Sequence, residues 1–512
     1  MTLDNTENTK RIAKNTLMLY VRMLFSMLVS LYTSRVVLQA LGVEDYGIYN
    51  VVGGLVSMFS LFSGSLSTAV SRFLTFELGR GDKERLKRVF STSFLIHLAL
   101  ALLIIVLAET VGLWFFNEYM VMPEARRHAA LWVYQGSIVS FVCGMLCVPF
   151  NASIVSHERM KAFAYIGITD VIIRLLIVLF VAYVPFSYDK LIVYSLLLVA
   201  EVVLFQFLYW MYSVRNFEEC RCVFIFDRAT MKSMAGFAGW NFIGSSSALL
   251  RDQGGNILLN MFGGPSVNAA RGIATSVNVA VCGFVNNFMV AVNPQITKSY
   301  AMGDHKYMMS LIFRSARFSF YLLFLLSLPI LLNTHYVLFL WLGIVPEHVV
   351  LFVQLILIFA MCESVSFPLV TAMLATGKIR NYQLVVGGLQ MSNLPLSYIL
   401  LKCGAIPETV MVVAIIVSIS CLVARLFMLR GMIGLSSGKF CKEVILNVLL
   451  VVLVGALLPI VVSYNNQESF WMFLLSCMVC LFFVGLSILY VGCSVNERSF
   501  IFDKIRERLK SR

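Results

Sequence analysis

Nine charged residues interrupt apolar stretches that are long enough to cross a lipid bilayer, and these residues are the best candidates for chemistry in the chain. They are Arg22, Arg35, Arg72, Arg174, Glu201, Arg251, Asp252, Arg271 and Glu363. An arginine or aspartate at the centre of a lipid-facing helix costs about 2.5 to 3.5 kcal/mol even on lenient insertion scales. We therefore expect these side chains to line a water-filled cavity in which the protein carries out its function.

The composition indicates a polytopic membrane protein. Of the 512 residues, 59% are hydrophobic and 13% are charged, whereas a soluble globular chain contains about 45–50% apolar residues. The polar start, residues 1–14, leads into an apolar run that is too long for the core of a signal peptide and has no small-residue cleavage site after it. We expect this first apolar segment to remain as a helix.

Apolar segments near the roughly 20 residues that a helix needs to cross a bilayer predict fourteen membrane helices. We expect them at residues 15–40, 48–76, 90–115, 129–154, 162–184, 190–213, 234–261, 268–292, 309–332, 349–375, 383–401, 410–429, 444–462 and 470–492.

The distribution of basic residues predicts the orientation of these helices. With the N-terminus inside, 27 of the 40 Lys and Arg residues lie in cytoplasmic segments, 4 lie outside and 9 lie within helices. This bias follows the positive-inside rule and places both termini in the cytoplasm. The net charge of +13 then reflects topology and contact with anionic membrane lipids, not nucleic-acid binding.

Motifs for catalysis and metal binding are absent from the sequence. It contains no Walker A loop, no paired carboxylates beside a nucleophile and no His-Glu zinc spacing. Cys220-Arg-Cys222 lacks a second ligand pair, and the twelve cysteines show no disulfide framework. Glycine pairs at 53–54, 254–255 and 387–388 favour close helix contacts over phosphate loops. We expect neither an enzyme nor a resident cofactor.

The two halves of the chain resemble each other at a nearly constant offset. The matches pair residues 70–82 with 292–304 at an offset of 222, 41–43 with 262–264 at 221, and 149–163 with 368–382 at 219. Three matches in the same order indicate duplication. Because an even number of helices separates equivalent positions, the halves keep the same orientation in the membrane.

The predicted architecture is an all-α membrane protein with two parallel six-helix lobes around a central cavity, followed by two C-terminal helices. The expected parts are an N-terminal lobe (1–213), a cytoplasmic linker (214–233), a C-terminal lobe (234–430), the last two helices (431–495) and a basic tail (496–512). The last two helices lack repeat partners and are almost free of charge, so we expect them to lie outside any pathway. The tail alternates apolar and basic residues, which suits an amphipathic helix on the inner leaflet or a solvated tail.

The depth of each charge in the membrane can be estimated, because a helix rises about 1.5 Å per residue. Arg314, Arg317 and Arg425 lie near cytoplasmic helix ends, where snorkelling to the interface would satisfy them without any function.

A second group lies at mid-membrane. Arg174 and Glu201 are on antiparallel helices at similar depth, and Asp170 is one turn from Arg174. These residues form either a closed salt-bridge cluster or a site that relays a proton or binds a coupling cation, H⁺ or Na⁺. Glu363, midway along its helix, is open to the same two interpretations.

A third group is hard to satisfy locally, because Arg22, Arg35, Arg251, Asp252 and Arg271 lie on helices that are expected to face the other lobe. Adjacent helical residues point about 100° apart, so Arg251 and Asp252 should not simply neutralise each other. An excess of arginine suits an anionic ligand, and the guanidinium group binds phosphate through two parallel hydrogen bonds.

Amide and hydroxyl groups accompany these arginines. The segment 240–247 is polar, and Asn278 is followed by further asparagines on the same helix. Sugars are bound through such groups, although small polar residues also hold membrane helices together. We include Asn278 in the expected substrate-binding set.

At these residues the chain resembles the O-antigen and capsule polysaccharide flippases of the multidrug, oligosaccharidyl-lipid and polysaccharide exporter (MOP) superfamily. The resemblance is carried by the segments 42–49, 251–264, 268–272 and 293–304, and it extends over about residues 10 to 495. The number of helices and the repeated lobes agree with it.

The resemblance implies a flippase that moves an undecaprenyl-diphosphate-linked oligosaccharide from the cytoplasmic to the periplasmic leaflet of a bacterial plasma membrane by alternating access of two lobes. The cavity arginines would hold diphosphate or acidic sugar. The resemblance also implies polysaccharide polymerase machinery as a partner.

Two alternatives remain open at this point. A cation-coupled multidrug exporter of the same superfamily would have an acidic cavity. A membrane glycan ligase or glycosyltransferase would need a large periplasmic loop or an acidic metal-binding pair, and the longest outer segments, 116–128 and 333–348, are short.

Overall fold

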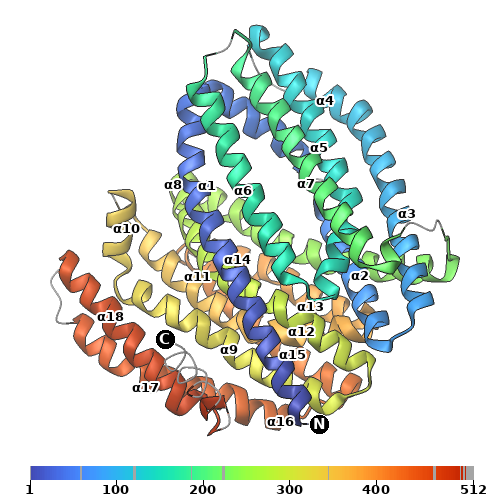
Figure 1. Cartoon of the computed structure of the whole chain (residues 1–512). Coiled ribbons are helices and arrows are strands. Elements are labelled where there is room, and N and C mark those ends of the chain that lie inside the picture. Colours follow the sequence, from blue (N-terminus) through green and yellow to red (C-terminus); the bar gives the residue numbers. More distant parts are fainter. Residues whose placement is uncertain are drawn as a thin grey trace, which may run out of the picture. The chain divides into compact units, whose positions relative to one another are not determined.

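The computed structural model describes residues 2–57, 60–118, 123–185, 187–221, 225–343, 345–464, 469–495, 497–499 and 502. These residues form helices and connecting turns, without a β-strand (Figure 1). The helices are α1 (Thr2–Ser57), α2 (Ser60–Arg80), α3 (Lys83–Leu107), α4 (Leu113–Glu118), α5 (Glu124–Ser156), α6 (Met160–Tyr183), α7 (Lys190–Asn216), α8 (Arg228–Ala301), α9 (His305–Leu332), α10 (Thr334–Leu342), α11 (Val349–Ser364), α12 (Phe367–Thr376), α13 (Arg380–Met391), α14 (Asn393–Lys402), α15 (Thr409–Ile433), α16 (Ser437–Phe440), α17 (Leu446–Tyr464) and α18 (Phe470–Ser487).

The prediction of an all-α membrane protein with many spans is confirmed. Eleven of the described helices are long and apolar enough to cross a membrane, or twelve if the pair α11 and α12, bent by 41°, counts as one span. Two of the fourteen expected spans, 48–76 and 234–261, are helical in their described parts but are not among these. Both are rich in serine and glycine, which lowers their hydropathy.

The chain divides into two compact units, Met1–Phe242 and Ile243–Arg512. The division falls inside α8, so the first turns of this helix belong to the first unit. Contacts with α2 and α3 hold the start of α8 in the first unit. The amide of Asp227, the residue before α8, donates to Thr92 Oγ1 on α3 at 3.4 Å. The ring of Phe237 on α8 meets the ring of Phe73 on α2 edge to face, with centroids 5.9 Å apart.

Two glycines break long helices at equivalent positions of the repeat. Gly42 in α1 has φ 81°, and Gly264 in α8 has φ 75°, a backbone conformation that L side chains rarely adopt. Their separation of 222 residues corrects the offset of 221 that we expected for this turn. Each long helix is therefore two segments joined at a glycine.

A second pair of turns also repeats at an offset of 222. Gly81 ends α2 with φ 75°, and Gly303 follows α8 with φ 76°. The next residue in each case, Asp82 or Asp304, caps the following helix by accepting a hydrogen bond at 3.0 Å from the backbone amide three residues on. The backbone thus reproduces the duplication predicted from the sequence.

Helix packing within each unit follows the apolar faces. In the first unit α5 packs against α7 and α1 packs against α6, as Figure 1 shows in the blue and green ribbons. In the second unit α11 packs against α15, and α17 packs against α18. One core of the first unit joins the ends of α2 and α3 to α5 and to the first turns of α8, through Val70, Leu74, Val89, Phe90, Phe150 and Met234.

The chain segment after α18 is held against α9 by a buried carboxylate. Glu497 accepts from Arg317 Nη2 at 3.0 Å and pairs with Arg314 Nε at 2.9 Å. We expected both arginines to be satisfied by snorkelling, and this was wrong because a protein carboxylate reaches them. The apolar residues of the expected amphipathic tail, Phe500, Ile501, Ile505 and Leu509, lie outside the described residues.

Candidate functional site

The first unit contains an ion pair at the centre of two membrane helices. Arg174 on α6 donates through Nε to both oxygens of Glu201 on α7, at 3.1 and 3.3 Å. Glu201 is 2% exposed, whereas half of the Arg174 side chain is exposed. The pair borders a pocket of about 390 Å³, which is also lined by Tyr49, Ser137 and Tyr194. The structure therefore brings the expected pair together beside an open space.

Asp170 extends this ion pair. It lies one turn before Arg174, and its carboxyl group interacts with the carboxyl group of Glu201 and with the charge of Arg22. Neighbouring carboxyl groups can share a proton. The cluster of Asp170, Arg174 and Glu201 thus has the parts of a proton site as well as those of a structural salt bridge.

Arg22 is placed differently from our expectation. Its guanidinium carbon lies 4.4 Å from the centre of the Phe163 ring, and Gly167 leaves room for it, because a Cβ at position 167 would lie 2.5 Å from Arg22 Nε. We expected Arg22 to be hard to satisfy locally; in the structure α1 packs directly on α6, so that Arg22 contacts Phe163 and lies near Asp170. Arg35, by contrast, is exposed.

In the second unit, Arg251 and Asp252 form a two-point ion pair, with Nε to Oδ1 at 2.9 Å and Nη2 to Oδ2 at 3.3 Å. We expected the angle between neighbouring helical residues to prevent this pairing. That expectation was wrong because the long arginine side chain bends around the helix. The Arg251 guanidinium also lies 5.1 Å from the centre of the Phe359 ring.

Arg271 is the most buried of the expected cavity arginines, at 8% exposed. Its Nη2 donates to the Asp252 carbonyl oxygen at 3.2 Å, and its buried Nη1 has no hydrogen-bond partner among the described residues. The side chain fits against Gly255, where a Cβ would lie 2.3 Å from Nη1. Arg271 therefore has a hydrogen-bond donor, Nη1, without an acceptor among the residues that the structure describes, and the absence of a side chain at Gly255 leaves the space that this group occupies.

Glu363 belongs to a separate cluster in the second unit. Its Oε1 accepts from Ser418 Oγ at 2.5 Å and lies 3.9 Å from Arg425 Nη1. Arg425 is only 2% exposed, so the expectation that it snorkels to the interface was wrong. Its Nε and Nη1 have no hydrogen-bond partner in the described part of the chain. The bend between α11 and α12 lies just after Glu363, inside the expected span 349–375.

Asn278 is half-buried, and its Oδ1 accepts from Cys282 Sγ at 3.2 Å one turn further along α8. Four of the expected residues, Arg251, Asp252, Arg271 and Asn278, lie in the second unit, and Arg22 and Arg35 lie in the first. No group of three or more metal-ligating side chains occurs in the residues that the structure covers.

Several residues that shape these clusters were missed from the sequence. Phe163 and Phe359 place aromatic faces under arginines, and Ser418 binds Glu363. The glycines carried a usable signal: the expected close contacts are confirmed at Gly255, and at Gly254, where a Cβ would lie 2.4 Å from Leu394. The aromatic residues carried none, because phenylalanine is abundant throughout the chain.

We compared the sequence and the structure with those of known proteins. No family profile matches the sequence. A segment of 165 residues is 25% identical to the uncharacterized membrane protein EpsK of Bacillus subtilis, and it spans 32% of this chain and 32% of that protein.

Solved structures of MATE transporters resemble most of the chain. A multidrug resistance MATE family transporter of the MOP superfamily in an outward-facing conformation has a TM-score of 0.68 at 14% identity, covering 83% of this chain and 96% of its own. A MOP superfamily transporter from Pyrococcus furiosus, described as having a binding pocket of reverse polarity, has a TM-score of 0.69 at 12% identity, with coverage of 83% and 96%. The chain thus has the fold of MATE transporters.

Proposed function

We propose that this membrane protein is a flippase for an anionic lipid-linked oligosaccharide, the class represented by undecaprenyl-diphosphate-linked repeat units. The single observation that carries the proposal is the state of Arg271: a guanidinium that is 8% exposed and has an unused buried donor. An unsatisfied buried polar group costs about 1–3 kcal/mol, and more when it is charged. A phosphate oxygen of the substrate would supply the missing acceptor.

The charges of the second unit agree with an anionic substrate. In the clusters around Asp252 and Glu363, these two carboxylates occur with three half-buried or buried arginines, Arg251, Arg271 and Arg425. Moving an ion of this size into a medium of low dielectric constant costs about 20 kcal/mol in the idealised limit, so a diphosphate cannot cross bare hydrocarbon. We propose that Arg35, Arg251, Asp252, Arg271 and Asn278 line the hydrated path of the head group, while the isoprenoid chain stays in lipid.

The mechanism that we propose is alternating access of the two lobes. An inside-negative membrane potential favours outward movement of an anion by about 2.3 kcal/mol per charge per 100 mV. The cluster of Asp170, Arg174 and Glu201, together with Glu363, would couple transport to a proton or cation. On this proposal both termini lie in the cytoplasm of a bacterium, and polysaccharide polymerase machinery receives the product.

A cation-coupled multidrug exporter is the second candidate, and the likeness of the fold to a multidrug resistance transporter favours it. Such an exporter would bind cationic or neutral drugs, and Arg271 would then be dispensable for substrate binding. The two candidates therefore differ in the sign of the charge that the site must accept.

The experiment that separates them replaces Arg271 with alanine or lysine and measures flipping of an undecaprenyl-diphosphate-linked sugar in proteoliposomes. We expect Arg271→Ala to lower the rate at least about tenfold, because a hydrogen bond between charged partners is worth about 1.5–3 kcal/mol, and Arg271→Lys to restore part of it. The matched control is Arg430→Ala, at an exposed arginine in the last turn of α15. Unchanged flipping by a well-folded Arg271→Ala protein would overturn the proposal, and extrusion of cationic dyes by both variants would favour the drug exporter.

A further inference from the structure

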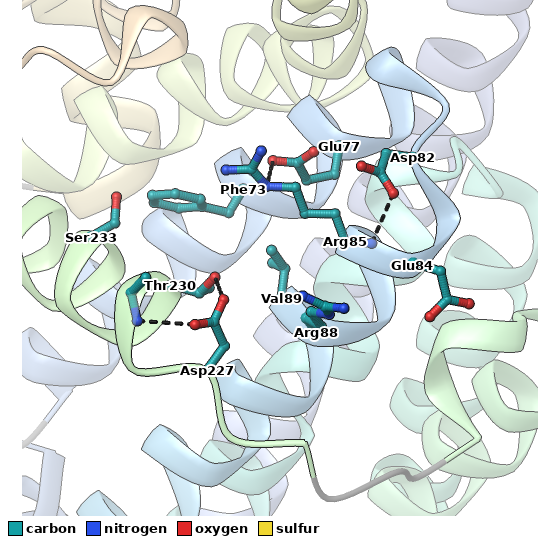
Figure 2. A pocket seen from close by; sticks show the side chains of 11 residues that line it. Phe73, Glu77, Asp82, Glu84, Arg85, Arg88, Val89, Asp227, Thr230 and Ser233 are labelled. Atoms are coloured by element: carbon teal, nitrogen blue, oxygen red, sulfur yellow. Dashed lines mark hydrogen bonds and ion pairs between the residues drawn. The ribbon is translucent and has the colours of Figure 1, made fainter.

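A second pocket lies in the first unit and shares no lining residue with the pocket beside Arg174 and Glu201. It has a volume of about 380 Å³ and lies where α2 ends and where α3 and α8 begin (Figure 2). Its charged lining consists of four carboxylates and two arginines: Glu77, Asp82, Glu84, Asp227, Arg85 and Arg88. In a chain with 40 basic and 27 acidic residues, this pocket reverses the overall balance.

Two of the four carboxylates hold helix ends. Asp82 accepts from the Arg85 amide at 3.0 Å, and Asp227 accepts from the Ala229 amide at 3.0 Å and from Thr230 Oγ1 at 2.6 Å (Figure 2). The hydrogen bond from the Thr230 hydroxyl, reinforced by that of the Ala229 amide, holds the pKa of Asp227 below its usual range. These negative charges are therefore fixed in place by the fold.

Glu77 is different, because only one of its two carboxylate oxygens has a partner in the part of the chain that the structure describes. It is 3% exposed, and its Oε1 lies 3.3 Å from Arg85 Nε. Its Oε2 is buried and accepts no hydrogen bond from any residue that the structure describes. A buried carboxylate oxygen without a donor is costly, so this position points to a donor that comes from outside the chain.

Arg85 pairs with the other oxygen of Glu77, Oε1, and leaves Oε2 without a donor among the described residues. More than half of its side chain (57%) is exposed, and its guanidinium group reaches only one oxygen of Glu77. The Arg85 side chain can therefore turn out into solvent, whereas Glu77 stays buried and needs a cation beside it. A ligand cation can then displace the Arg85 side chain from Glu77.

The chemistry of the pocket selects the kind of cation. A divalent metal needs several ligands on one point, and no group of three or more metal-ligating side chains is found within the described residues. An ammonium group is a compact charge with three donors, one of which can bind Glu77 Oε2 while the others bind water or polar groups of the lining. Hydroxyl groups of Thr230 and Ser233 line the same space.

We infer that this pocket binds a primary ammonium group, which contacts Glu77 and displaces Arg85. The group comes either from a phospholipid with an ethanolamine head group or from a soluble amine such as putrescine. The ligand would touch both α3 and the first turns of α8, so its binding should stabilise the attachment of these turns to the first unit. This site is independent of the proposed transport pathway.

The test uses the purified full-length protein in nanodiscs and measures thermal stability and ligand binding. One series of nanodiscs contains phosphatidylethanolamine and a matched series contains phosphatidylcholine, whose quaternary ammonium has no N–H donor; putrescine is titrated into the second series. We expect stabilisation by one of the two sources and a loss of affinity of at least about tenfold in Glu77→Gln, since a hydrogen bond to a charged group is removed. Glu443→Gln, at an exposed carboxylate in the second unit, is the control.

A second variant keeps the inference testable if Glu77→Gln folds poorly. Arg85→Gln removes the competing cation but leaves the backbone amide that Asp82 caps, so it should bind putrescine or the ethanolamine lipid more tightly than the wild type does. Stabilisation by the lipid alone identifies a head-group site, and stabilisation by putrescine alone identifies a site for soluble amines. If neither ligand stabilises the wild type, or if Glu77→Gln and Arg85→Gln bind as the wild type does, the inference is wrong.

Discussion

The two lobes share the ion pairs and turns that hold certain helix ends, and they differ in the charged residues in the middle of their helices. Asp189 precedes α7 and pairs with Arg126, and Glu408, which is 219 residues further on, precedes α15 and pairs with His348 at 2.5 Å. The same offset relates Glu158, with φ 59°, to Gly377, with φ 74°. Ion pairs and turns that hold helix ends therefore occur in both copies.

The charged clusters do not repeat in this way. The positions equivalent to Arg174 and Glu201 of the first lobe are Asn393 and Ser420 in the second, and the position equivalent to Arg271 is Tyr49 in the first. Conversely, Glu363 and Arg425 correspond to Gly144 and Gln206 of the first lobe. The duplicated parts form the scaffold, so we look for function where the copies differ.

The largest effect should come from breaking the pair that only the first lobe contains. Arg174→Leu leaves Glu201 buried without its partner, and we expect a loss of on the order of 3 kcal/mol in the free energy of unfolding, together with loss of transport. The decisive protein is the double variant Arg174→Leu with Glu201→Leu, in which neither member of the pair is left as a buried charge without its partner. It should fold like the wild type and still fail to couple transport to an ion gradient.

The control for this experiment is the double variant Lys439→Ala with Glu443→Ala, which removes an exposed pair. Thermal stability and ion-driven flipping in proteoliposomes are the measurements. Full ion-coupled transport by the Leu–Leu protein would show that Arg174 and Glu201 form only a structural salt bridge.

A smaller effect should follow from filling the spaces that glycines leave for arginines, one in each lobe. A methyl group at position 255 would displace Arg271, and one at position 167 would displace Arg22. We expect each alanine variant to lose about 1–3 kcal/mol of stability through overpacking. Only Gly255→Ala should also reduce flipping, because of these two arginines only Arg271 is proposed to meet the substrate.

Gly388→Ala is the matched control, since a Cβ at this helical glycine meets nothing within 4 Å. Melting temperatures and flipping rates of the three variants are compared at equal protein level. An equal loss of flipping in Gly167→Ala and Gly255→Ala would mean that the two arginines do not differ in role.

Hydropathy and motif spacing predicted the class of fold and the duplication, because both depend on which residues are apolar and on glycines that need a positive φ, such as Gly264. They failed for the partners of the arginines. A guanidinium on a flexible stem can reach a neighbour on its own helix, as Arg251 does, or an aromatic ring on another, as Arg22 does. Helical angles and depth do not determine such choices, since the rotamer and the packing of the adjacent helix decide them.

The smallest effect should come from the duplicated turns, and here the two lobes should behave alike. Gly81 and Gly303 have φ values of 75° and 76°, and a Cβ at either position would meet nothing within 4 Å. Replacement by alanine therefore costs only backbone strain, about 1–2 kcal/mol in each case, and should leave flipping unchanged. Thermal unfolding of the two single variants measures it. A clear inequality between them would show that the two turns, although alike in geometry, contribute differently to the stability of their lobes, and the division into a shared scaffold and distinct chemical sites would need to be redrawn.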